Sequence, residues 1–369
     1  MTSSVYGYLL FTLAAFFVIG FVRLFIQKVN LHSLRWLFGA FACWPLYMTD
    51  EWLRLSNATQ WAPIYGLSEV FAVVAITCCY RAIKPMLIAT PSARKRLWWP
   101  VAVTGVLQLS ILFISPQDRQ AWFAASPVGE PLYLWPAYLP SLLTSFSVLL
   151  IGILITEHIQ HYHRYLPLQA VDTKPLKVPR LAAVMGSVVG IAFVSILLVT
   201  AVMFGFLKVP FWESFHHLML GASLVLVLFS LTFVRSTLPS PIDYAQLDHG
   251  KASPYEISSM MSKAERYVVT SKAFKKPFLT LQSFCEGAHL EPTLFAIALQ
   301  VNERKTFQRF IFHYRLEYVK NELLPTDTSL ASRANAMGIE SEKFLSGYLS
   351  QYLSPKATKR LKISTTQRN

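Results

Sequence analysis

The stretch LAAVMGSVVGIAFVSILLVTAVMFGF, residues 181–206, decides the class of this protein, because it contains no charged side chain. About 20 mainly apolar residues are enough for a helix to cross the roughly 30 Å hydrocarbon core of a bilayer. In the whole chain of 369 residues, 53% are hydrophobic and 15% are charged, whereas soluble domains carry about 25% charged residues. This composition excludes an ordinary cytosolic enzyme, a disordered chain and a collagen-like fibre, and it indicates a membrane protein.

Six further apolar stretches bring the number of predicted membrane-spanning helices to seven, all within residues 1–235. The second is the weakest, because it is short and contains Trp44-Pro45. The first is not a cleavable signal peptide, since no positive charge precedes it and its apolar run is too long. The predicted spans are residues 5–26, 34–48, 61–80, 97–114, 132–155, 181–206 and 215–233.

The basic residues between these spans predict the orientation of the chain, because Lys and Arg accumulate in cytoplasmic loops. Twelve of them lie in or beside the first, third and fifth connections, and three lie in the others. We therefore expect a multi-pass protein of the bacterial inner membrane, with the N-terminus outside and everything after Arg235 in the cytoplasm. The twelve are Arg23, Lys28, Arg35, Arg81, Lys84, Arg94, Lys95, Arg96, Arg164, Lys174, Lys177 and Arg180, and the three are Arg54, Arg119 and Lys208.

The composition changes after the last predicted span. Residues 236–255 contain three prolines and several small polar side chains, which is typical of a linker. From Arg235 onward there are 19 Lys and Arg against 12 Asp and Glu, a contribution of +7 to the net charge of +14. Residues 256–369 suffice for one soluble domain and show helical spacing of apolar residues without a strand pattern. The predicted fold is therefore all-α: a seven-helix membrane bundle followed by a cytoplasmic helical domain.

The helical pattern in residues 256–369 has a recognisable order. It predicts helices near 258–271, 280–286, 292–301, 306–324, 329–337 and 342–352, with Pro292 in the first turn of its helix, where a missing N–H costs nothing. A short helix, a tight turn and a second helix form a first unit. A long helix connects this unit to a second pair of helices, which repeats the same order. This order is typical of two helix-turn-helix units in tandem.

Residues 258–361 resemble the DNA-binding domain of the AraC/XylS family of bacterial transcription regulators, which carries two such units joined by a long helix. The resemblance implies double-stranded promoter DNA as the partner and no cofactor. The sequence departs from the family pattern at His289, Arg304 and Arg333, and near Leu353 about two residues are missing. The matching residues are Leu279, Thr280, Leu281, Phe284, Ala288, Leu290, Pro292, Phe295, Leu299, Thr306, Phe307, Phe310, Arg315, Leu316, Glu317, Leu323, Leu324, Asp327, Ser329, Leu330, Ala334, Gly338, Ser354 and Pro355.

The DNA-binding hypothesis assigns two kinds of contact. Side chains near the start of a recognition helix meet base edges in the major groove. They would be Thr293, Leu294, Ala296, Ile297 and Gln300 in the first unit, and Ser341, Glu342, Lys343, Ser346 and Ser350 in the second. Basic side chains neutralise phosphates independently of sequence, and here they would be Arg304, Lys305, Arg309, Lys356, Lys359 and Arg360. A basic surface beside an anionic bilayer is the alternative interpretation of these charges.

Six ionisable residues in the membrane part are candidates for sensing a signal. Glu69 is expected about 12 Å below the outer surface, within the third predicted span, and an acid inside a membrane indicates a functional site by default. Asp50, Glu51, Glu213, His216 and His217 gather at the predicted outer ends of the second and seventh spans, where they could bind a cation or sense pH. Wetted helix ends are the alternative for these five, and a protonated or hydrogen-bonded side chain between packed helices is the alternative for Glu69. No standard metal spacing is present: the histidines of HIQHYH, residues 158–163, match no strong zinc pattern.

The sequence carries no catalytic motif, so we expect no enzyme. The function it favours is a membrane-embedded transcription regulator that passes a membrane or extracytoplasmic signal to promoter DNA. A homodimer would lengthen the DNA site. The alternative is a membrane receptor or scaffold whose degenerate helix-turn-helix domain binds a protein partner. A third hypothesis, a transporter with a regulatory tail, predicts transport that depends on Glu69.

Overall fold

The computed structural model describes residues 3–26, 31–87, 95–234, 238, 242, 247, 253–276, 278–302 and 306–323. Within these ranges the protein is helical and has no β-strand; Ala170 and Thr280 form an isolated β-bridge. The chain divides into two compact units, one made of residues 1–162 and 178–241 and the other of residues 163–177 and 242–369.

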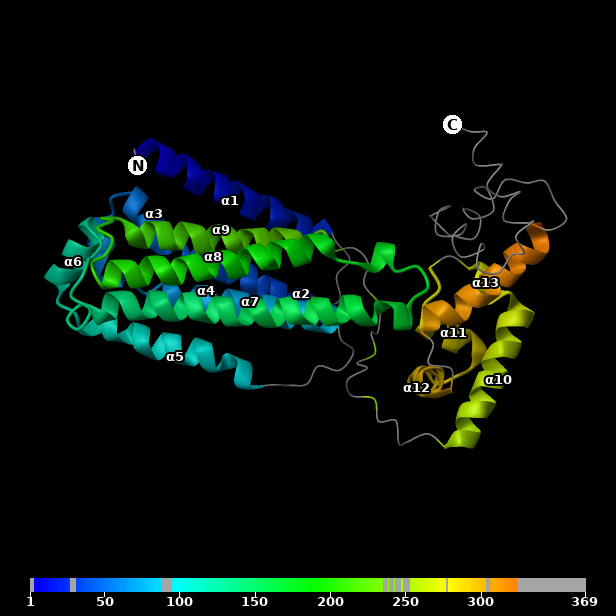
Figure 1. Cartoon of the computed structure of the whole chain (residues 1–369). Helices are drawn as coiled ribbons and strands as arrows, with labels where there is room; N and C mark the ends of the chain where they lie inside the picture. The colour runs from blue at the N-terminus through cyan, green and yellow to red at the C-terminus, as the bar shows by residue number, and fades with distance from the viewer. Residues whose placement is uncertain are drawn as a thin grey trace. The chain divides into compact units, whose positions relative to one another are not determined.

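The first unit contains the long apolar helices (Figure 1). α2 packs on α4, α8 packs on α9, and α1 packs on α9. Its elements are α1 (Ser3–Ile26), α2 (Leu31–Tyr47), α3 (Thr49–Leu55), η1 (Thr59–Ile64), α4 (Glu69–Leu87), η2 (Lys95–Trp98), α5 (Trp99–Gln108), η3 (Leu109–Phe113), α6 (Pro116–Ala124), α7 (Trp135–Gln169), which continues into the second unit, α8 (Pro179–Met203) and α9 (Trp212–Leu231).

Five described helices are long and apolar enough to cross a membrane: α1, α4, α7, α8 and α9. A sixth is present if the bent segment Trp99–Phe113 with Pro116–Ala124 counts as one span. α2 has 17 residues, just below the usual length of a span. The protein is thus a multi-pass membrane protein by the length and composition of its helices, and the number seven stays a prediction.

A break or a bend in the helix changes two of the predicted spans in the structure. The span expected at 61–80 begins at Glu69, because Pro63 lies in a short 3-10 helix and Gly66 has a φ of +85°, a left-handed conformation that interrupts a helix. The span expected at 97–114 bends by 108° before α6. There Ile114 ends η3 with an extended backbone, and Ser115 caps the start of α6, since its Oγ accepts a hydrogen bond from the N–H of Asp118.

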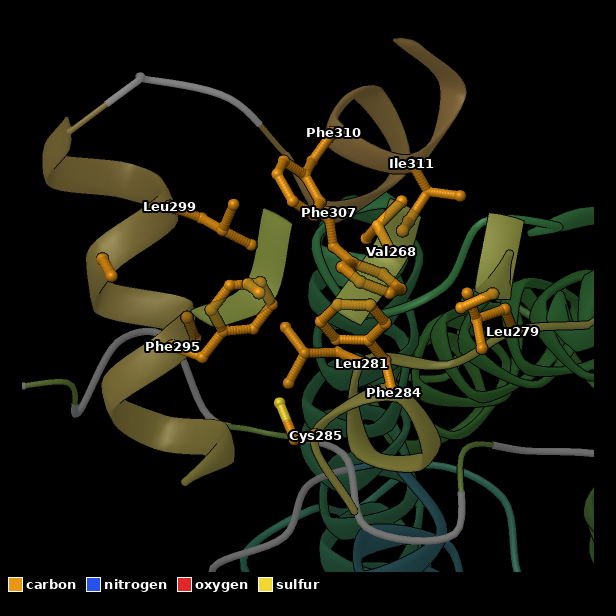
Figure 2. Packing of buried hydrophobic residues seen from close by; sticks show 14 of the residues in the cluster. Val268, Leu279, Leu281, Phe284, Cys285, Phe295, Leu299, Phe307, Phe310 and Ile311 are labelled. Carbon is orange, nitrogen blue, oxygen red and sulfur yellow. The ribbon is translucent and has the colours of Figure 1, made fainter. Parts of the chain in front are cut away.

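The second unit is a small helical domain around one aromatic core. Its elements are η4 (Lys174–Leu176), α10 (Pro254–Ser271), η7 (Ala273–Lys275), α11 (Leu281–Ala288), α12 (Pro292–Asn302) and α13 (Phe307–Leu323), together with the last residues of α7. Figure 2 shows Phe284 facing Phe295 and Phe307, and the centroids of the Phe284 and Phe295 rings are 5.4 Å apart. Such ring pairs add to the free energy gained by burying apolar surface.

Residues 163–177, which are the end of α7 and most of its connection to α8, belong to the second unit, although the rest of that unit begins only at residue 242. The side chain of Val171 is buried in the aromatic core, and its N–H donates to the carbonyl of Leu279. Asp172 pairs with the buried guanidinium of Arg315, with a distance of 3.2 Å from Nη1 to Oδ1. The backbone N–H of Phe278 donates to the same carboxylate. A connection between two apolar helices therefore supplies core residues and a buried ion pair to the C-terminal domain.

Candidate functional site

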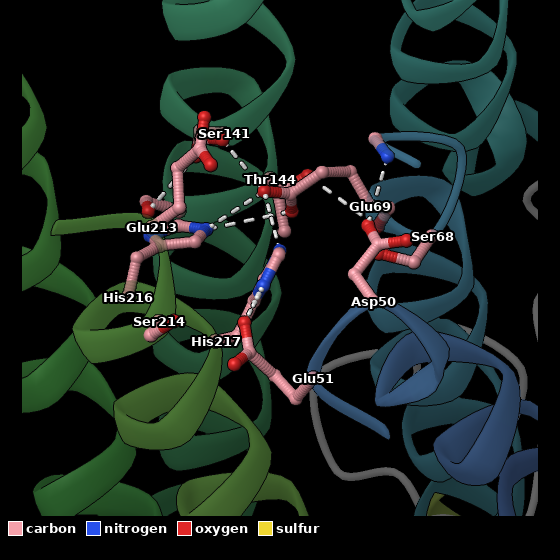
Figure 3. A network of polar contacts seen from close by, with 12 residues as sticks. Asp50, Glu51, Ser68, Glu69, Ser141, Thr144, Glu213, Ser214, His216 and His217 are labelled. Atoms are coloured by element: carbon pink, nitrogen blue, oxygen red, sulfur yellow. Dashed lines mark hydrogen bonds and ion pairs between the residues drawn. The ribbon is translucent and has the colours of Figure 1, made fainter. Parts of the chain in front are cut away.

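The first unit contains a buried network of polar side chains where the N-terminal turns of three helices meet (Figure 3). Every carboxylate in it lies in the first turn of its helix, where the helix dipole favours negative charge. All six predicted sensor residues take part, and each is at most 7% exposed. They are Asp50 and Glu51 on α3, Glu69 on α4, and Glu213, His216 and His217 on α9.

Glu69 and two histidines form the centre of this network. The Nε2 atoms of His216 and His217 lie 3.1 Å and 3.3 Å from Oε1 of Glu69. The hydroxyl of Ser141 on α7 donates to the same oxygen at 2.6 Å. The sequence predicted Glu69 within a span, but the structure places it at the first residue of α4, because the helix starts later than expected.

The second nitrogen of each histidine also has a partner. Nδ1 of His217 lies 2.6 Å from Oε1 of Glu51, and Nδ1 of His216 lies 2.7 Å from the hydroxyl of Ser195. The hydroxyl of Tyr6 donates to the other oxygen of Glu51. Burial opposes the ionisation of Glu51, but the hydrogen bond and charge of His217 outweigh it and lower the pKa of Glu51. The two imidazole rings are therefore held in place from both sides.

Two further carboxylates flank the centre. Glu213 pairs with Arg54 at 2.9 Å, and the hydroxyls of Tyr65 and Ser126 donate to it. Burial raises the pKa of Asp50 to about 6. The Asp50 carboxylate accepts hydrogen bonds from the hydroxyl of Ser68 at 2.7 Å and from the N–H of Gly66 at 3.1 Å.

A small cavity of about 20 Å³ lies beside the network. A single water molecule needs a cavity volume of roughly 10–15 Å³, measured in the same way. The cavity is therefore large enough for a water or a small ion next to the carboxylates. Its lining includes Asp50, Tyr65, Glu69, Ser141, Glu213 and His217.

Sequence reasoning found the acids and histidines because ionisable residues near apolar runs are conspicuous. It missed Ser141 and Ser195, since a serine in a long apolar helix gives no signal of its own. It also counted Arg54 only as a charge in a loop, whereas the structure places this side chain at Glu213. Its pairing could not be predicted, because 159 residues of chain separate the two.

The predicted DNA-contact residues have mixed positions in the structure. Thr293 is exposed, and Leu294 and Gln300 are half-buried. Ala296 and Ile297 are 1% and 2% exposed, which contradicts their prediction as groove-facing side chains. α12 packs against both α10 and α11, and Ala296 belongs to the core that they share.

Arg309, a predicted phosphate contact, is exposed near the start of α13. The other predicted contacts lie outside the described residues, as does the whole second helix-turn-helix unit. These contacts are Arg304, Lys305, Ser341, Glu342, Lys343, Ser346, Ser350, Lys356, Lys359 and Arg360.

No protein-family model, no curated protein and no solved structure shows significant similarity to this chain.

Proposed function

We propose that this protein is a transcription regulator embedded in the bacterial inner membrane, in which a signal received by the membrane unit controls DNA binding by an AraC-like domain. The observation that carries the proposal is the order α11, turn, α12, α13 around a common core. Phe284, Phe295, Leu299, Phe307 and Phe310, which the family resemblance assigns to scaffold positions, are all buried in that core.

The turn between α11 and α12 supports the helix-turn-helix interpretation. Thr280 caps the start of α11 through a hydrogen bond from the N–H of Ser283. His289 ends α11 with a φ of 53°, a left-handed conformation that glycine adopts most easily. This is the position where the AraC/XylS family usually has glycine. After Leu290 and Glu291 the chain enters α12 at Pro292, so the turn has the length typical of the motif.

The proposed topology needs seven crossings, two of which use shorter helices. α2, at 1.5 Å per residue, extends about 25 Å. The segment Trp99–Phe113 combines an α-helix with a 3-10 helix, whose rise of about 2.0 Å per residue also brings it to roughly 25 Å. Both lengths approach the hydrocarbon thickness. Reporter fusions at Asn369 and in the loop after α4 test the arrangement, which requires both positions to be cytoplasmic.

α7 offers a route for the signal. Ser141 on this helix donates to Glu69 in the polar network, and the same continuous helix continues past His163 into the residues that belong to the second unit. A signal acts only by binding two states of the protein with different affinity. We propose that occupancy of the polar network shifts α7, and with it the Val171 and Asp172 contacts within the second unit.

Chromatin immunoprecipitation of the tagged full-length protein tests the proposal and identifies its target promoters. The enriched promoter is then titrated with the purified full-length chain in nanodiscs, since Val171 and Asp172 would be absent from a fragment that starts at the linker. Arg309→Ala should weaken binding to all sequences and reduce the salt slope by about 1. Lys263→Ala removes an equal charge from an exposed position on α10 and should leave binding unchanged.

The scaffold alternative is favoured by one observation. Because Ala296 and Ile297 are buried and Leu294 and Gln300 are half-buried, Thr293 is the one exposed residue among the base contacts predicted on α12. A folded protein that enriches no promoter and binds no DNA at low salt would support this alternative over DNA binding.

A further inference from the structure

We infer that Glu69, His216 and His217 bind one divalent transition-metal ion. Their ligand atoms all lie within 4.8 Å of one another and are buried. Zinc bonds of about 2.0–2.1 Å in a tetrahedral site separate neighbouring ligand atoms by roughly 3.3 Å. The distances from Oε1 of Glu69 to the two Nε2 atoms are 3.1 Å and 3.3 Å, which match two of the three edges between these ligands in such a site.

The groups around the three side chains are those that support a metal site. A histidine ligand usually donates its other ring N–H to a carboxylate or another acceptor, which fixes the tautomer with a lone pair facing the metal. Glu51 accepts from Nδ1 of His217 in this arrangement, and the hydroxyl of Ser195 does so for His216. With both Nδ1 atoms donating, both Nε2 lone pairs face Glu69, and a metal ion between these atoms would bind all three ligands.

The charge of the network favours a cation. The network buries four carboxylates, those of Asp50, Glu51, Glu69 and Glu213. Within the part of the chain that the structure describes, the permanently charged cation paired with them is Arg54, through Glu213. A metal ion on Nε2 displaces any proton from that nitrogen, so with both histidines neutral the four carboxylates and one guanidinium contribute a formal charge of −3, and an unpaired buried charge is costly. One divalent ion reduces this to −1.

The donor set selects the class of metal. Imidazole nitrogens suit zinc, copper, iron and nickel, whereas calcium and magnesium prefer oxygen ligands alone. Two nitrogens and one carboxylate oxygen leave one coordination position open, and the cavity of about 20 Å³ beside Glu69 and His217 has room for a water there. We therefore assign the site to an ion such as Zn²⁺. Its role as the signal that the regulator senses rests on the proposed function, whereas the site itself does not.

Calorimetric titration of the chelator-treated full-length protein in nanodiscs with Zn²⁺ tests the site. We expect one ion per chain, no competition from Mg²⁺ or Ca²⁺, and a visible absorption band of four- or five-coordinate cobalt when Co²⁺ replaces Zn²⁺. Glu69→Gln and His217→Ala should each weaken binding by more than about 100-fold, and Glu51→Gln, which acts only through His217, by about 10–100-fold. His161→Gln removes a histidine on α7 that pairs with Glu157 outside the network, and should leave binding unchanged.

Several outcomes would overturn the inference. One is the absence of stoichiometric Zn²⁺ binding by the folded wild-type protein, which would mean that protons alone fill the network. Another is equal affinity in the wild-type and Glu69→Gln proteins. If a variant fails to fold, the wild-type stoichiometry and cobalt spectrum decide. Binding of Zn²⁺ without any change at the target promoter would leave the site standing and refute its role as the signal.

Discussion

Replacing Asp172 by Asn should loosen the C-terminal helical unit, although this residue lies in the connection between α7 and α8. Arg315 has a side chain only 1% exposed, and Asp172 is the carboxylate that pairs with it. The carbonyls of Phe274 and Lys276 also accept hydrogen bonds from the guanidinium, at 2.7 Å and 3.1 Å. They satisfy its donors without neutralising its charge.

The expected cost follows from this geometry. Removing one partner of a buried ion pair costs about 3–5 kcal/mol. The side chain of Asp172 is 17% exposed, so we take the lower end of that range, about 3 kcal/mol. Each 1.4 kcal/mol corresponds to a tenfold change in an equilibrium constant, and the open form of the unit should become roughly 100-fold more populated.

Alkylation of Cys285 measures this opening in the full-length protein. Cys285 is fully buried in the aromatic core, and burial raises its pKa to about 12, so the folded thiol reacts slowly. Peptide mass spectrometry follows Cys285 and, as an internal reference in the first unit, the buried Cys79. Glu317→Gln is the matched control, because it removes an exposed carboxylate from the same helix as Arg315. An Asp172→Asn protein whose Cys285 reacts at the wild-type rate would refute the reasoning.

Three further predictions concern the same unit, each read by the Cys285 reaction or by thermal unfolding. His289→Gly should stabilise it by about 0.5–1 kcal/mol, because glycine adopts the φ of 53° without strain; destabilisation would contradict this account. Gly287→Ala should destabilise it by about 1–3 kcal/mol, since the new Cβ would overlap the hydroxyl of Tyr267, and a neutral effect would show that this ring moves freely. The capping interaction with Ser253 lowers the pKa of Glu256. The ionised Glu256 carboxylate therefore stabilises the unit fully above pH 4.5, and this stabilisation is lost as the pH falls through the lowered pKa. Glu256→Gln should therefore lower the melting temperature at pH 7 but much less near pH 3, and an equal effect at both would exclude this cap as the cause.

The amino-acid sequence by itself determined the class of the protein and much of its local structure. Long uncharged runs such as 181–206 can only be stable as buried or lipid-facing helices, and the structure confirms apolar helices of spanning length. The aromatic core of the second unit was also predictable, because residues such as Phe295 and Leu299 recur at helical spacing and must find a common apolar interior.

Only the tertiary structure decided which distant residues meet. The sequence indicated that Glu69, His216 and His217 were unusual, but their common centre depends on where α4 starts and on how α9 packs beside it. It gave no indication that Asp172 pairs with Arg315. Helical periodicity is a local property, whereas contacts between residues more than a hundred positions apart depend on the packing of whole helices, and no short stretch of sequence encodes that packing.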